Sequence, residues 1–173
     1  FGKNDSCKRD TIFYSNVGFE HRRSGFQIPT HMTFDSTKID TLQAHAGKHS
    51  LNIESKNEFC ITLKSTVKQL FTAPSGCVNV SAWIYSEEKF NAQIVMEVGD
   101  PNGKRDWQAK LLPQFVTPSP KGEGQGVRWQ ELFATLELPS TAYPDDEVVI
   151  YLWNPDKNSF YLDETTGIDY HRK

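Results

Sequence analysis

Apolar and polar residues alternate with a period of two along most of the chain, which predicts β-strands rather than helices. In the clearest run, residues 78–85, the aliphatic side chains share one face, and Trp83 and Tyr85 lie on the other. Residues 92–98 repeat this pattern, and Gly99 to Gly103 carry a dense turn signal. Further strands are expected at 11–14, 50–53, 59–63, 107–112, 129–138, 148–153 and 160–168.

The connections between these strands contain turn and loop residues. Long loops are expected from Gly25 to Lys38 and over the Pro-, Gly- and Ser-rich residues 113–126. Residues 65–73 have room for one helical turn, although Thr66 and Val67 weigh against it. Many short strands without a βαβ rhythm predict an all-β fold, a two-sheet antiparallel β-sandwich of the jelly-roll type. We divide the chain into an N-terminal lead-in, residues 1–15, and the sandwich domain, residues 16–173.

Composition narrows the class of protein. Aromatic residues make up 12% of the 173 residues, which suits strands. A formal net charge of −3 argues against nucleic-acid binding, and no apolar run is long enough to span a membrane. The chain begins with Phe1 rather than Met, so we expect a processed product or an excised piece.

The three cysteines, Cys7, Cys60 and Cys77, are too few and too scattered for a zinc site. They leave open one disulfide with a free thiol, or three buried thiols. A bridge from Cys7 to either of the others would tie down the polar N-terminal stretch.

Motifs for catalysis are absent from the sequence. There is no Gly-x-Ser-x-Gly elbow and no His-Glu-x-x-His, and the Gly-rich stretch 122–126 lacks the Lys-Ser/Thr of a phosphate-binding loop. His45 and His49 share a face in an extended chain but are too far apart to chelate one ion. The carboxylates are explained by turns and solvent-facing positions. The sequence therefore predicts a domain that is not an enzyme.

Several segments, taken in order, resemble the jelly-roll carbohydrate-binding modules and their galactose-binding-domain-like relatives. They are Gly18-Phe19-Glu20, the stretch 44–51 (AHAGKHSL), the strand 80–85 (VSAWIY), 129–132 (WQEL), 149–154 (VIYLWN) and 160–163 (FYLD). The resemblance runs from Gly18 to Ile168. The same pattern occurs in accessory domains of large secreted and cell-surface proteins, especially of Bacteroidetes-like bacteria.

The resemblance also implies a structural calcium ion near the two ends of the domain. Its ligands would be Glu20, a backbone carbonyl around Gly47 or Lys48, and Asp163. Carboxylate and carbonyl oxygens are the ligands that Ca²⁺ prefers. Glu164 replaces the commoner aspartate after Asp163, which puts one ligand in doubt. A simple hydrogen-bonding role for Glu20 and Asp163 is the alternative.

Aromatic residues are the candidates for sugar contact. If the aliphatic faces form the core, one outer or concave face would carry the aromatics, with Gln93, Glu97 and Asn154 nearby for hydrogen bonds. The glycan-binding candidates are Trp83, Tyr85, Tyr151, Trp153, Trp107 and Asn154, whereas the resemblance assigns Trp129 to the core.

Two functions follow as alternatives. The first is a secreted or cell-surface carbohydrate-binding domain that attaches a larger protein to a polysaccharide. The second is a structural or protein-interaction domain of a large secreted adhesin, toxin or secretion-system substrate, with no sugar ligand. Exposed aromatics on the concave face favour the first, and a covered face favours the second.

Overall fold

The computed structural model describes residues 16–17, 19, 32–45, 47–70, 76–86, 91–100, 102–103, 105–111, 129–163, 165–166 and 169–172. The lead-in at residues 1–15, the strand expected at 11–14 and the loop expected at 113–126 lie outside these ranges.

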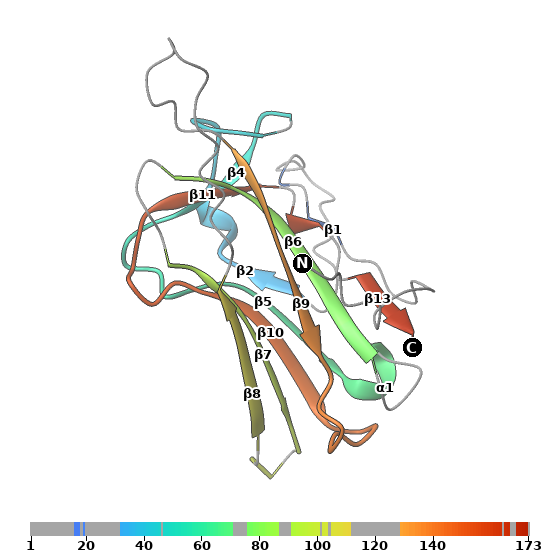
Figure 1. The fold of residues 1–173 in the computed structure, drawn as a ribbon. Coiled ribbons are helices and arrows are strands. Elements are labelled where there is room, and N and C mark those ends of the chain that lie inside the picture. Colours follow the sequence, from blue (N-terminus) through green and yellow to red (C-terminus); the bar gives the residue numbers. More distant parts are fainter. Residues whose placement is uncertain are drawn as a thin grey trace.

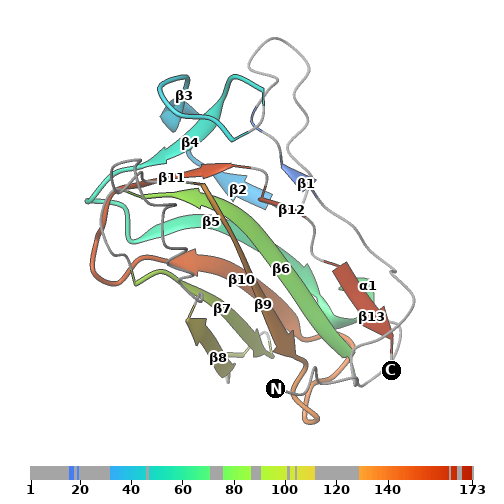
Figure 2. The same ribbon diagram turned by 45° about the horizontal axis from the view of Figure 1, so that its top comes forward.

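Two antiparallel sheets pack face to face, so the predicted β-sandwich is confirmed (Figures 1 and 2). The first sheet has five strands in the order β2-β5-β10-β7-β8. Their bounds are Met32–Phe34 for β2, Phe59–Thr66 for β5, Glu147–Trp153 for β10, Gln93–Gly99 for β7 and Arg105–Leu111 for β8.

The second sheet has six strands, with β6 (Gly76–Tyr85) at its centre. One side of β6 pairs with β9 (Gln130–Glu137) along most of its length. The other side pairs with both β13 (Asp169–Arg172) and β11 (Phe160–Asp163). The sheet continues from β11 to β4 (Ser50–Ile53) and β3 (Ile39–Asp40). A separate two-stranded sheet joins β1 (Asn16–Val17) to β12 (Thr165–Thr166).

The core lies between the two sheets and follows the alternation along each strand. Val148, Ile150 and Leu152 of β10 point inward, as do the aliphatic residues of β6 from Val78 to Ile84. Removing these surfaces from water provides the main stabilisation of the sandwich. The residues between them along each strand therefore face outward, and these outer faces are where a binding site has to be sought.

Some expected connections contain short elements. Strand β2 lies within the loop expected at residues 25–38, which corrects that prediction, and the 3₁₀ helix η2 (Ser36–Lys38) follows it. One helical turn, α1 (Val67–Leu70), does form after β5. The turn predicted at Gly99 to Gly103 joins β7 to β8, where Gly103 has φ of +102°. No helix in the described ranges is both long and apolar enough to cross a membrane.

The cysteines differ in state. Cys77 is disulfide-bonded, whereas Cys60 is a free, buried thiol whose pKa burial raises to about 12. Cys7 lies outside the described residues.

Candidate functional site

The predicted aromatic residues do not share one face, which corrects the prediction of a common platform. Trp83 and Tyr85 belong to β6 in the six-stranded sheet, and Tyr151 and Trp153 belong to β10 in the five-stranded sheet. Alternation does turn all four away from the core, as predicted, but toward opposite outer faces of the sandwich. A single glycan chain therefore cannot contact both pairs in the same way.

On the six-stranded sheet, Trp83 is covered by a histidine. The imidazole of His45 stacks on the Trp83 ring with a centroid distance of 3.7 Å and an interplanar angle of 13°. The backbone N–H of His45 donates a hydrogen bond to Asp163 Oδ2 over 2.8 Å, and Asp163 is the register partner of Trp83. This bond holds the loop against the sheet, so His45 occupies one face of the Trp83 ring.

Neighbouring aromatics extend this packing. Tyr85 lies 5.6 Å from Trp129 and 6.2 Å from Tyr161, measured between ring centroids. Trp129 also contacts His45 edge-on at 5.8 Å. Trp129 is half-buried in this outer cluster rather than in the core. It lies just before β9, on the side of the sheet opposite to the inward residues Ala134 and Leu136. Its assignment to the core was wrong.

On the five-stranded sheet, each aromatic of β10 is held by a carboxylate. The Tyr151 hydroxyl donates a hydrogen bond to Glu97 Oε1 over 2.8 Å. The Trp153 indole Nε1 donates to Glu58 Oε1 over 3.2 Å. Hydrogen bonds to charged acceptors are the stronger kind, so both rings are fixed in orientation while they stay half-buried. Glu58 Oε2 makes no hydrogen bond to the described residues and can accept one from a ligand.

Phe59 completes this surface, and sequence reasoning missed it. Its side chain is 58% exposed, and its ring meets Tyr151 edge-on with a centroid distance of 5.5 Å. Strict alternation would turn Phe59 inward with Ile61 and Leu63. The register between β5 and β10 shifts between Tyr151 and Trp153, and this irregularity places Phe59 opposite Trp153. We call the surface formed by Glu58, Phe59, Glu97, Tyr151 and Trp153 the β10 face.

The middle of the five-stranded sheet is less accessible than its Phe59 end. Val95 and Val149 face outward by register but are only 0% and 8% exposed. Thr33 and Lys64 are exposed, on strands β2 and β5. Trp107 is the register partner of Glu97 on the neighbouring strand β8. The accessible part of the β10 face is therefore the part nearest to Phe59.

Asn154 was predicted to contact glycan, and the structure assigns it a different position. Its side chain is fully buried at the end of β10. Nδ2 donates to the carbonyl oxygens of Asn57 and Asn158 over 3.0 and 2.8 Å, and Oδ1 accepts from the N–H of Asn158 over 3.1 Å. Because all of these groups belong to the protein, Asn154 supports the loops beside the β10 face instead of binding a ligand.

Comparisons with known proteins give a likeness of fold only. No protein-family model matches the chain, and no relative is found among curated proteins. The CBM22-1 xylan-binding domain of Paenibacillus barcinonensis Xyn10C matches with a TM-score of 0.51 at 17% identity, covering 96% of this chain and all of that one. The C-terminal family 22 module of Clostridium thermocellum Xyn10B matches with a TM-score of 0.50 at 15% identity, covering 96% and 97% of the two chains.

The fold resembles that of the family 22 carbohydrate-binding modules. A further match is the C. thermocellum Xyn10B CBM22-1–GH10 structure in complex with xylohexaose, with a TM-score of 0.53 at 11% identity. This chain covers 29% of that longer chain, with 96% of its own residues aligned. The resemblance inferred from the sequence is thus confirmed for the fold.

The calcium position implied by that resemblance stays a prediction. Asp163 is a buried carboxylate, and Gly47 and Lys48 lie exposed in a turn where Gly47 has φ of +67°. Glu20 lies outside the described residues. Within the described ranges, no three His, Cys, Asp or Glu side chains come together, so a calcium ion would need Glu20 and main-chain carbonyls besides Asp163. These oxygen donors fit the preference of the ion.

Proposed function

We propose that the chain is a non-catalytic domain that binds a polysaccharide through the β10 face, as part of a larger secreted or cell-surface protein. The observation that carries the proposal is the exposed Phe59 ring beside Tyr151 and Trp153. Pyranose rings have apolar faces and hydroxyl edges. Aromatic rings beside carboxylate acceptors complement both surfaces.

The carboxylates of this face support a binding role rather than catalysis. Glycoside hydrolysis needs one carboxyl group as an acid and a second as a base or nucleophile. Here Glu97 and Glu58 each accept a hydrogen bond from an aromatic side chain. That arrangement orients the rings for stacking, and Glu58 Oε2 remains to accept a bond from a sugar hydroxyl.

Three further observations support xylan as a ligand and a larger secreted protein as the context of the domain. One of the similar structures is a xylan-binding domain, and another is in complex with xylohexaose, which makes xylan the first ligand to test. The match joined to a GH10 module supports a place in a larger protein. The disulfide at Cys77 fits an oxidising compartment and hence a secreted protein.

One observation favours the alternative, a protein-interaction domain without a sugar ligand. Val95 points to the outer side of the five-stranded sheet yet is completely buried, so the middle of that outer side is covered. A covered face suits a fixed neighbour better than a long glycan. The exposure of Phe59 at the end of the same sheet is why we place the glycan hypothesis first.

The test is calorimetric titration of xylan and xylohexaose into the wild-type chain and into two matched variants. Phe59→Ala removes the exposed ring from the β10 face. Phe133→Ala removes a ring that is equally exposed, at 59%, from the outer side of the six-stranded sheet. We expect Phe59→Ala to weaken binding by about tenfold or more, about 1.4 kcal/mol, and Phe133→Ala to leave it unchanged. Equal affinities in both variants would contradict the assignment to the β10 face. A failure of the wild-type chain across a wider glycan array would support the interaction domain.

A further inference from the structure

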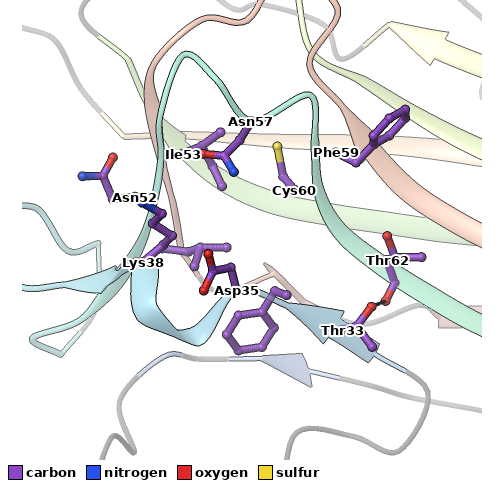
Figure 3. A pocket seen from close by; sticks show the side chains of 11 residues that line it. Thr33, Asp35, Lys38, Asn52, Ile53, Asn57, Phe59, Cys60 and Thr62 are labelled. Carbon is purple, nitrogen blue, oxygen red and sulfur yellow. Dashed lines mark hydrogen bonds between the residues drawn. The ribbon is translucent and has the colours of Figure 1, made fainter.

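A cavity of about 220 Å³ opens beside the β10 face, at the edge of the sandwich (Figure 3). Phe59 and Thr62 of β5 line it, and Phe59 also contacts Tyr151, so the cavity adjoins the β10 face. Its volume far exceeds the roughly 10–15 Å³ that one water requires, and is below the roughly 300–1,000 Å³ of pockets for drug-sized ligands. The space therefore suits one small, ring-sized molecule.

The cavity wall carries an amide that lacks a partner. Asn57 Oδ1 is buried and accepts no hydrogen bond within the described part of the chain. The backbone of Asn57 is fixed, because its N–H donates to the Glu54 carbonyl over 2.8 Å and its carbonyl accepts from Asn154 Nδ2. A buried acceptor without a donor costs about 1–3 kcal/mol. A rotation of the Asn57 side chain toward the cavity would bring this oxygen within reach of a ligand hydroxyl, which would supply the missing donor.

The other walls combine polar rims with an apolar floor. Asp35 and Lys38 lie across the cavity from Asn57 in Figure 3, and Leu51 and Ile53 of β4 contribute aliphatic surface. Asp35 Oδ1 accepts two hydrogen bonds from Thr37, which lower the pKa of Asp35 and keep it a carboxylate. Convergent polar groups over an apolar floor are typical of small-molecule sites.

Charge at the cavity favours a neutral ligand. Lys38 Nζ is paired with Glu54 Oε1 at 2.9 Å, and Lys56 Nζ pairs with the second oxygen of Glu54 at 2.8 Å. The formal charges of Lys38, Lys56, Glu54 and Asp35 therefore sum to zero. An anionic sugar would have to compete with Glu54 for Lys38 and would approach Asp35.

We propose that this cavity binds one neutral sugar residue, either the end or a side branch of the glycan that lies on the β10 face. Its hydroxyls bond to Asn57 and Asp35, and an apolar ring face lies toward Leu51 and Ile53. The proposal rests on the proposed function and makes it more specific, because the cavity would select glycans by their ends or branches.

The test follows the side-chain amide signal of Asn57 by nuclear magnetic resonance in the full chain. The signal is identified as the one lost in Asn57→Ala. The probes are D-xylose, L-arabinose, D-galactose and D-glucose, with D-glucuronate as the anionic control. We expect at least one neutral sugar to shift this signal and glucuronate to shift it less. The shift should persist in Tyr151→Ala, because Tyr151 belongs to the β10 face but does not line the cavity.

Oligosaccharides then distinguish chain ends from branches. If Asn57→Ala weakens xylohexaose binding by roughly tenfold, the cavity takes a chain end. If it weakens only an arabinose-substituted xylo-oligosaccharide, the cavity takes a branch. Asn57→Ala removes an unpartnered buried group, so its thermal midpoint should equal or exceed that of the wild type. No shift with any neutral sugar, or an equal shift with glucuronate, would overturn the proposal, even if Phe59-dependent glycan binding is observed.

Discussion

Asn154 offers the sharpest test of how the loops beside the β10 face are held. Its side chain makes three hydrogen bonds to the backbone of Asn57 and Asn158, and its own N–H donates to the Glu58 carbonyl over 2.7 Å. The Asn154→Ala change deletes the three side-chain bonds and leaves partly buried backbone groups of Asn57 and Asn158 without these partners. At about 1 kcal/mol for each bond, we expect a loss of about 3 kcal/mol in the free energy of unfolding.

For a chain of this size, that loss corresponds to a fall of about 6–12 °C in the thermal midpoint, measured by scanning calorimetry. Asn102→Ala is the matched control, since Asn102 is exposed in the turn between β7 and β8, and we expect a change within about 0.5 kcal/mol. Asn154→Asp keeps the shape but turns a carboxylate toward two carbonyl oxygens, so it should cost at least as much as alanine. An Asn154→Ala chain with an unchanged midpoint and lost glycan affinity would refute the reasoning and restore Asn154 as a ligand residue.

Three other measurements test separate features. Cys60 should resist a thiol reagent in the native chain and react only on unfolding, because burial raises its pKa to about 12 and hides the sulfur; rapid native labelling would contradict its burial. The pKa of Glu54 is lowered from 4.5 to about 2 by Lys56 and Lys38, so its stabilising effect is present above pH 4.5 and lost as the pH falls toward 2. Glu54→Gln should therefore flatten the decline of the thermal midpoint over that window, and an identical decline would show that the ion pairs add nothing. For the predicted calcium, EDTA should lower the thermal midpoint and added Ca²⁺ should restore it. Asp163→Asn should abolish this response. A wild-type midpoint that does not change with EDTA would contradict the calcium prediction.

Alternation predicted the long strands well because each of them has one face in the core. Strands β6, β7 and β10 carry three or four inward aliphatic residues each, so their period is visible in the sequence. Strands β2, β3 and β13 have only two to four residues. Such short strands exist because a neighbour offers hydrogen bonds, and no local pattern records that pairing.

The candidate site was only partly predictable for a related reason. Alternation shows that Trp83 and Tyr151 point away from the core, but it does not show to which sheet a strand belongs. Phe59 was missed because a register shift between β5 and β10 reverses its expected direction. Asn154 was misassigned because a polar residue after an aromatic strand looks like a ligand residue. Its partners are instead backbone groups of Asn57, nearly a hundred residues earlier, and of Asn158, four residues later.

The pairing of β6 has a consequence for where the domain can be cut. The first part of β6, Gly76 to Asn79, pairs on one side with β13, which spans Asp169–Arg172. A boundary placed before Asp169 would leave these backbone N–H and C=O groups as a bare edge beside the disulfide-bonded Cys77. Bare edges recruit strands from other molecules. Shortened versions of the domain should therefore self-associate, even though every residue of the β10 face would still be present.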